Sequence, residues 1–463
     1  MKLLILALTS LCWITTVAAS EFSDSFLLRV IEAYNLRPLP TKPFEETSKF
    51  KLGRAIFFDP IISGNRDVSC ATCHLLHRGT SDGLAISSGT GAIGLAESRS
   101  LPADRPQQPR NAPGLWNLDN NTVTSMFWDG RVEMLDPVRR IFRNPLGHNL
   151  PKGFENLMAV QAIFPIARED ELLGRPQDRS PATLPYPHGN IPNEIANLTN
   201  SLSGLEEMNK ISQLIMRRLI GSGDDPERQW HSKYRMLVKA AYPKVSPDDL
   251  SIVHIANALS HFEEIAFATR DAPWDTYLKG DTDAIGIPAK RGALVFYGKG
   301  RCAVCHNGPL FSDFGFHAIG VQNNGPGIKG GEDFGRYHAT KDLADKFKFR
   351  TPPLRNVTLT APYFHNGSAE TLEDVIAQHS DPLQHADKYK ESGRFRMSFE
   401  QINAISPILL AVPIRILDRD VSDLKAFLKA LEDKGLANIQ KIVPLSVPSG
   451  LPVATVRPKL ETE

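Results

Sequence analysis

Two stretches, Cys70–His74 (CATCH) and Cys302–His306 (CAVCH), decide how this chain is interpreted. Both follow the pattern C-x-x-C-H, in which two cysteines bond to the vinyl groups of one porphyrin and the adjoining histidine ligates its iron. The pattern therefore predicts two covalently bound haems of the c type. The predicted attachment residues are Cys70, Cys73, His74, Cys302, Cys305 and His306, with His74 and His306 as iron ligands.

Other chemistry can use cysteine pairs of this spacing. A lone C-x-x-C can form a redox disulfide or half of a zinc site. Here the two pairs lie far apart in the sequence, each is followed directly by histidine, and neither follows a βαβ pattern. These observations favour haem. The second axial ligand then decides the function, because a strong ligand gives an electron-transfer haem and an open face gives a catalytic one.

The composition is that of an ordinary globular protein. The chain has 463 residues, of which 41% are hydrophobic and 23% charged, and this length is enough for two domains with separate cores. Lys and Arg number 53, and Asp and Glu number 52. Because nucleic-acid-binding proteins carry clustered positive charge, this balance gives no indication of a nucleic-acid partner.

The first 19 residues have the pattern of a signal peptide. Lys2 is followed by an apolar run over residues 3–14 and by small residues before Ser20, where cleavage is expected. The alternative is an uncleaved anchor helix, but the apolar run is short for crossing a bilayer. Cleavage would remove Cys12 and leave four cysteines, all of them in the two C-x-x-C-H stretches. Since haem of the c type is attached after export, we expect a periplasmic protein.

Helical spacing of apolar residues predicts three helices, over Ser25–Leu36, from Ser246 to about Ala268, and over Asp420–Asp433. Between them the chain is rich in proline and glycine, which predicts long irregular loops. No internal repeat is evident beyond the two attachment stretches. We place the boundary between two domains near residues 245–275. The end of the chain, residues 441–463, contains four prolines and is expected to be a flexible tail.

Several stretches around the cysteine motifs are similar to those of a known family. They are Leu52–Pro60, Phe127–Arg131, Arg336–Tyr337, Phe349–Pro352, Leu354–Val357 and Pro362–Gly367. Together they resemble the bacterial dihaem cytochrome c peroxidase family, which includes the MauG-type enzymes, from about residue 47 to 435. With the helical pattern, the resemblance implies a mainly α fold of two cytochrome c-like haem domains with long irregular loops. The two domains would cover residues 20–245 and 246–440.

In this family the N-terminal haem is the peroxidatic one, and electrons enter through the C-terminal haem or are stored there. A Trp of the F-W-D-G-R motif lies between the two haems, which implies that position for Trp128. The alternative for Trp128 is an aromatic residue of the core, and one ring can serve both purposes.

The family's catalytic pair is a Gln and a Glu ten residues apart, with a Pro four residues after the Gln. Gln161, Pro165 and Glu171 have this spacing, provided that about two dozen residues are inserted near 135–160. The resemblance then implies that Glu171 moves a proton between the peroxide oxygens. Gln161 would hydrogen-bond the peroxide or orient Glu171. The alternative for Glu171 is a solvated acid within the charged run Arg168–Glu171.

One departure from the family concerns the first haem. Many relatives hold a His over the peroxidatic iron in the Gly-rich segment that here spans residues 86–92, and this segment has no His. His77 follows His74 too closely to replace it. We therefore predict an open first haem that needs no reductive activation.

The sequence leaves open which residue ligates the other face of the second haem. Relatives place a Met or a Tyr at the position of Ala361, which cannot ligate iron. Tyr363, His365 and Met397 are the candidates, Met397 on account of its soft sulfur. The alternative for Tyr363 and His365 is local hydrogen bonding.

The resemblance also implies a calcium ion between the haem domains, to which Asn111 would contribute. The alternative for Asn111 is a turn-forming residue ahead of Ala-Pro. A homodimer is a further implication of the resemblance.

Three functions follow from these observations. The first is a periplasmic peroxidase that reduces hydrogen peroxide to water with electrons from a small cytochrome c or cupredoxin. The second is a MauG-type enzyme that oxidises residues of a partner protein. The third is a dihaem electron carrier without catalytic activity, and the missing distal His argues against it.

Overall fold

The structure is a computed structural model that describes residues 24–221, 228–246, 249–321, 332–384, 397–410, 414–435 and 439–453. The expected signal peptide, residues 1–19, lies outside these ranges. Within them, no helix combines the length and the apolar character that crossing a membrane requires.

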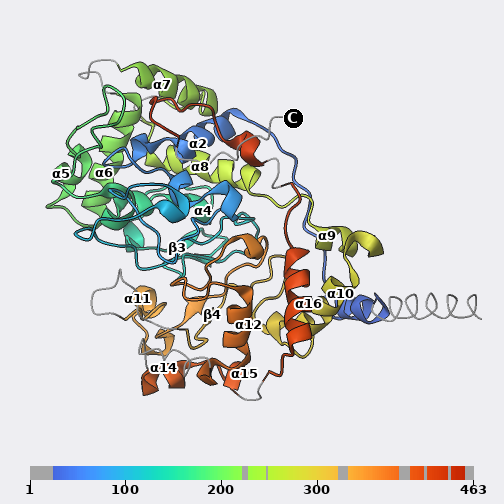
Figure 1. Ribbon diagram of the computed structural model, residues 1–463. Coiled ribbons are helices and arrows are strands. Elements are labelled where there is room, and N and C mark those ends of the chain that lie inside the picture. Colours follow the sequence, from blue (N-terminus) through green and yellow to red (C-terminus); the bar gives the residue numbers. More distant parts are fainter. Residues whose placement is uncertain are drawn as a thin grey trace, which may run out of the picture.

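The described chain is mostly helical, as expected, and its strands are short (Figure 1). After a first helix over residues 24–33, the α-helices are α2 Ser48–Phe58, α3 Cys70–Cys73, α4 Leu157–Ala162, α5 Glu194–Thr199, α6 Gly204–Ile220, α7 Gln229–Ala241, α8 Ile252–Ala266, α9 Pro273–Leu278, α10 Ile287–Tyr297, α11 Tyr337–Thr340, α12 Leu372–Ser380, α14 Phe399–Ala404, α15 Pro407–Leu410 and α16 Asp418–Lys429. One antiparallel sheet has the order β1 Ser125–Met126, β2 Val132–Asp136, β3 Ile141–Arg143. A second antiparallel pair is β4 Phe316–His317 and β5 Phe349–Arg350.

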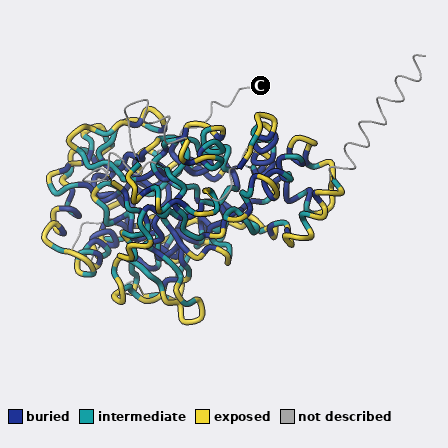
Figure 2. Tube along the Cα trace, turned by 90° about the horizontal axis from the view of Figure 1, so that it is seen from below, coloured by how far each residue is buried: buried dark blue, intermediate teal, exposed yellow. Residues whose placement is uncertain are grey.

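Buried hydrophobic side chains form two clusters, and Figure 2 shows the buried trace running inside a rim of exposed loops. The first cluster consists mainly of residues between 39 and 267, and the second mainly of residues between 274 and 431. Helix α8 belongs to the first, because its Val253, Ala256 and Phe262 are buried in that cluster and the helix packs against α2. The change from one cluster to the other therefore follows α8, between residues 267 and 274, which lies within the expected range 245–275 but after residue 246.

Each cluster contains one close crossing of two helices. In the first, Gly53 of α2 lies so close to α8 that a Cβ at this position would overlap the Ala258 backbone oxygen. In the second, Gly292 of α10 lies in the same way against the Asp423 oxygen of α16. Aromatic rings from both helices pack beside each crossing. Only glycine allows the backbones to approach this closely.

The crossing helices also form an internal repeat that the sequence did not lead us to expect. Lys51–Phe58 of α2 and Lys290–Tyr297 of α10 both begin with Lys, have Gly two residues later, and end in a pair of aromatic residues. Each segment precedes one C-x-x-C-H stretch. The similarity is short, and the loops that lead to the cysteines differ in length, which explains why it is hard to detect.

The end of the chain returns to the first cluster, beside α2 and α7 in Figure 1. Val447 and Leu451 are buried there, and the Ser449 hydroxyl donates to Asp59 over 2.6 Å. The expectation of a flexible tail is therefore wrong for residues 441–453, because their apolar side chains pack between the prolines. Residues 454–463 lie outside the described part.

The helix bounds differ by a few residues from the expected ones. Helix α8 begins six residues later than expected, because Ser251 is the extended residue that caps it. Helix α16 begins two residues early and ends four residues early. The first helix, residues 24–33, ends three residues early. Differences of this size are usual at helix ends.

Substitution of Gly292 by Ala tests the close crossing. The added methyl group would overlap the Asp423 oxygen, so the helices must separate, and we expect a loss of about 1–3 kcal/mol in the free energy of unfolding. Chemical denaturation of the holoprotein measures this. Asn209→Ala, at an exposed position of α6, is the control and should stay within about 0.5 kcal/mol. Equal stability of the two variants would contradict the crossing.

Candidate active site

The first C-x-x-C-H stretch lies in the wall of a large cavity. Helix α3 carries Cys70 and Cys73, which together with His74 line a cavity of about 900 Å³. This volume is within the range of cofactor pockets. His74 Nδ1 lies 2.9 Å from the Thr80 backbone oxygen, which fixes the ring and leaves Nε2 available to a metal.

The second stretch repeats this arrangement. Cys302, Cys305 and His306 line a second cavity of about 250 Å³, and His306 Nδ1 lies 2.9 Å from the Phe311 backbone oxygen. Each cavity thus presents two thiols and one imidazole with a free Nε2. This is the set of groups that a haem of the c type requires. The residues present therefore fit one haem at each stretch.

Gln161 and Glu171 line the first cavity together with His74. Gln161 lies in α4, and Glu171 lies in a π-helical turn over Glu169–Leu173. Burial raises the pKa of the Glu171 carboxyl above its ordinary value, although Arg168 Nε lies 3.0 Å from it. The structure thus brings together the Gln and the Glu that the spacing selected.

The segment without a His, residues 86–92, does not line the first cavity. Gly89 packs against the Glu171 backbone. The Thr90 backbone amide donates a hydrogen bond to the Glu171 backbone oxygen over 2.9 Å. The segment therefore supports the turn that carries Glu171. His77 lines neither cavity.

The stretch expected to be inserted, residues 135–160, contains the end of β2, all of β3 and the start of α4. Within it, Arg143–Leu146 line the first cavity. Glu133 of β2 pairs with Arg143 and with Arg336, both at 3.0 Å. The stretch is therefore tied to a part of the chain that follows the second C-x-x-C-H stretch.

Trp128 lies in the wall that the two cavities share, because it lines both of them. Its Nε1 donates to the Asn111 backbone oxygen over 2.9 Å, and Asn111 also lines both cavities. The Asn111 Nδ2 donates to the Leu84 oxygen over 2.7 Å. Its Oδ1 is therefore the side-chain atom that would face a cation.

Two of the three candidate ligands of the second haem line the second cavity. Tyr363 and His365 do so, whereas Met397 and Ala361 do not. Met397 precedes α14, which contributes no residue to the cavity wall, so the structure does not bring Met397 to the second cavity. His365 stacks on Phe349 with ring centres 3.6 Å apart, and burial lowers the pKa of His365 to about 3.

His379 of α12, which sequence reasoning missed, also lines the second cavity. The ring centres of His306 and His379 are 6.4 Å apart. Metal–nitrogen bonds to histidine are about 2.0 Å long, so two imidazoles on opposite sides of one metal have ring centres about 6 Å apart. His379 Nδ1 lies 2.8 Å from the Val375 oxygen, and Nε2 is the free nitrogen, as in His306. A single His in a helix gives no sign in the local sequence that it faces a second imidazole in the folded chain.

A family model described as di-haem cytochrome c peroxidase matches residues 47–283, just over half of the chain. The chain belongs to the di-haem cytochrome c peroxidase family. The matched range includes Cys70–His74 and the three residues Trp128, Gln161 and Glu171.

Similar proteins extend over most of the chain. It is 29% identical over 388 residues to the methylamine utilization protein MauG of Methylorubrum extorquens, covering 83% of this chain and 78% of that protein. It is 27% identical over 371 residues to the cytochrome c peroxidase Ccp of Escherichia coli, covering 79% and 60% respectively. The solved structure of a MauG-like protein associated with microbial copper homeostasis matches with a TM-score of 0.56 at 25% identity, covering 87% of this chain and 95% of that one. The chain is accordingly a peroxidase-like oxidoreductase.

Buried ion pairs hold the wall shared by the two cavities together. Arg110 pairs with Asp129 over 2.7 Å and, through hydrogen bonds of 2.7 and 2.8 Å, with Asp333. Asp129 also pairs with Arg131 over 3.2 Å. Burial by itself would raise the pKa of Asp129, but Arg131 and Arg110 outweigh it and hold this pKa well below its usual range. The pairs connect the chain around Trp128 to the chain around Asp333.

A second carboxyl group of the first cavity was also missed by sequence reasoning. Glu263 of α8 is buried and lines the cavity, and burial raises the pKa of Glu263 to about 8. It is therefore protonated at neutral pH. A lone Glu within the apolar stripe of a helix gives no indication of such a position.

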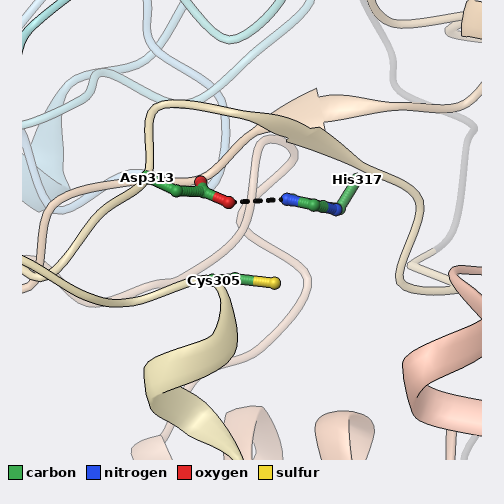
Figure 3. Close-up of side chains that lie close together, drawn as sticks. All are labelled: Cys305, Asp313 and His317. Atoms are coloured by element: carbon green, nitrogen blue, oxygen red, sulfur yellow. Dashed lines mark hydrogen bonds and ion pairs between the residues drawn. The ribbon is translucent and has the colours of Figure 1, made fainter. Parts of the chain in front are cut away.

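Cys305 of the second C-x-x-C-H stretch has a polar pair beside it (Figure 3). Asp313 Oδ2 lies 2.9 Å from His317 Nε2, and both groups lie within 4.8 Å of Cys305 Sγ. The hydrogen bond that His317 donates to the Asp313 carboxylate raises the pKa of His317 to about 10, so the pair is ionic at neutral pH. These three side chains are of types that bind metals. Because Cys305 belongs to the second C-x-x-C-H stretch, its sulfur would bond a haem there, and the pair would lie beside that bond.

Asp333→Asn tests the ion pairs of the shared wall. The variant leaves the buried Arg110 with one carboxylate fewer, and we expect a loss of about 3 kcal/mol in the free energy of unfolding. Glu400→Gln is the matched control, because it breaks the exposed pair with Lys346 and should cost about 0–1 kcal/mol. Denaturant unfolding of both variants is the measurement, and a similar small cost for both would speak against a structural role of these pairs.

Proposed function

We propose that this protein is a periplasmic di-haem c-type peroxidase that reduces hydrogen peroxide to water at the first cavity. A small redox protein, a cytochrome c or a cupredoxin, supplies electrons through the second cavity. The observation that carries the proposal is that Gln161, Glu171 and His74 line one cavity, and that Trp128 lies in the wall shared with the other. The peroxidases among the relatives support the same reaction.

Covalent haem at each C-x-x-C-H stretch would supply an iron that exchanges electrons with peroxide in the first cavity and with the donor in the second. The two hydrophobic clusters would be the cores of two haem domains, divided after α8. The apolar start of the chain supports export through a cleaved signal peptide. Asn111 is the residue at which we place a calcium ion between the domains.

Reduction of one peroxide to two waters consumes two electrons and two protons. Glu171, as a carboxylate, accepts the proton of one peroxide oxygen and returns it to the other, so that the O–O bond breaks with water as the leaving group. Gln161 donates an amide hydrogen bond that orients the peroxide or the Glu171 carboxylate. Trp128 offers an aromatic route for electrons between the cavities.

Glu171→Gln tests the proton transfer. The amide cannot act as a base, so the rate of the reaction with peroxide should fall by about 10²–10⁴-fold, measured by stopped-flow absorbance. Burial raises the pKa of Glu171, and the base form is the active one. The wild-type rate should therefore decline as the pH falls through this raised pKa, and E171Q should lack that decline.

Glu169→Gln is the control for Glu171→Gln. Glu169 belongs to the same turn but pairs with Arg175 at the surface and does not line the cavity. E169Q should keep the wild-type rate and pH profile. Wild-type kinetics in E171Q would remove Glu171 from the mechanism.

We further propose that His379 is the second axial ligand of the haem at His306. The 6.4 Å between the ring centres supports this, and the bond from His379 Nδ1 to the Val375 oxygen leaves Nε2 available. The first cavity, by contrast, receives no side chain from residues 86–92. Electron transfer and peroxide chemistry are thereby assigned to different haems.

Removal of the imidazole in His379→Ala should convert the second haem from low spin to high spin, and added imidazole should restore the low-spin form. The absorption and EPR spectra of the ferric protein measure this. Met397→Ala and His365→Ala are the controls and should keep the wild-type spectra. Loss of the low-spin signal in H365A, or its persistence in H379A, would show that another residue is the ligand.

A MauG-type enzyme is the second candidate function. Two relatives are named MauG, at 29% and 25% identity over most of this chain. Such an enzyme would use peroxide to oxidise a residue of a partner protein rather than a small donor. Oxidation of two reduced cytochromes c per peroxide supports the peroxidase, whereas peroxide consumption without oxidation of the cytochrome supports the MauG-type function.

A further inference from the structure

Arg350 of β5 is a buried cation without an ion-pair partner among the described residues. The side chain is 3% exposed, and its Nε donates to the Phe127 backbone oxygen over 2.9 Å. Its Nη1 is buried and has no hydrogen-bond partner. Burial lowers the pKa of Arg350 to about 10, so the group is charged at neutral pH. An uncompensated buried charge is costly, which indicates that an anion is missing from its surroundings.

The described carboxylates do not supply this anion. Asp129 is the acid whose charge acts on Arg350, but Arg110 and Arg131 already pair with it at 2.7 and 3.2 Å. Asp333 is likewise engaged by Arg110. Among the residues that the structure describes, neither nearby carboxylate is left to compensate Arg350, and a bound anion would do so.

The cavities offer the space that such an anion would occupy. Arg350 lines both of them, in the wall that also carries Trp128. Two further buried groups of the second cavity have a nitrogen without a hydrogen-bond partner, namely Trp116 Nε1, 5% exposed, and His365 Nε2, 3% exposed. Neither of these two lines the first cavity. Three unpartnered nitrogens thus line the second cavity, and buried nitrogens of this kind normally have partners.

We propose that Arg350 and Trp116 bind a propionate of the haem attached at Cys302 and Cys305. A haem carries two carboxylates, and a guanidinium group pairs with a carboxylate through parallel hydrogen bonds. The proposal rests on the presence of this haem, which belongs to the proposed function, but not on turnover of peroxide. Arg350 is in this account a positioning residue.

The same residue also positions Trp128. The Arg350 amide donates to the Trp128 backbone oxygen over 2.8 Å, while its side chain holds the Phe127 oxygen. One residue thus binds the haem carboxylate with its side chain and the turn that carries Trp128 with its backbone. The distance between the second haem and Trp128 is fixed by this double contact.

Reduction potentials of the full-length holoprotein test the proposal. Removal of the cation in Arg350→Gln leaves the propionate uncompensated, which favours the ferric state, so the midpoint potential of the low-spin haem should fall. Arg350→Lys keeps the charge and should stay closer to the wild type. Trp116→Phe removes one hydrogen-bond donor and should shift the same potential in the same direction by less.

Arg291→Gln is the control, because Arg291 pairs with Asp423 and lines neither cavity. Its potentials should equal those of the wild type. An unchanged low-spin potential in R350Q, or a shift confined to the high-spin haem, overturns the proposal. If R350Q yields no holoprotein, W116F decides, and an unchanged low-spin potential in W116F overturns it. A pyridine haemochrome count below two per wild-type chain would instead refute the proposed function.

Discussion

The close crossings at Gly53 and Gly292 determine most of this architecture. Each brings a helix that precedes a C-x-x-C-H stretch into contact with a helix far along the chain, α2 with α8 and α10 with α16. The same helices line the cavities, through Ile56 and Leu259 in the first and through Phe296 and Leu424 in the second. Hydrophobic packing therefore positions each attachment stretch and the cavity wall together, and the loops can be long and irregular without loss of the site.

The wall between the cavities is the second structural constraint. It contains Trp128, Asn111 and Arg350, which line both cavities, and it is braced by the buried Arg110–Asp129 and Arg110–Asp333 pairs. Buried pairs of this kind contribute little net stability, but losing one partner is costly, so they fix a single arrangement. A fixed arrangement is what electron transfer between two attachment sites requires, since the route must have a constant length.

The sequence predicted those features that depend on local pattern. The attachment stretches are contiguous, and Gln161 and Glu171 both follow the inserted stretch, so their spacing is intact and the sequence alone predicts both. His379 could not be found in this way, because a single His near the end of a helix is ordinary until the fold brings its ring to 6.4 Å from His306. The packed chain end was missed for a similar reason: its prolines suggested a free tail, and only the first cluster supplies a surface for Val447 and Leu451.

The division of labour between an open first haem and a six-coordinate second haem is the central claim. The most direct test is EPR spin quantification of the purified, oxidised full-length protein. The account predicts one high-spin and one low-spin ferric haem per chain in equal amounts. Two low-spin haems would contradict it, because no open coordination site would then be available to peroxide.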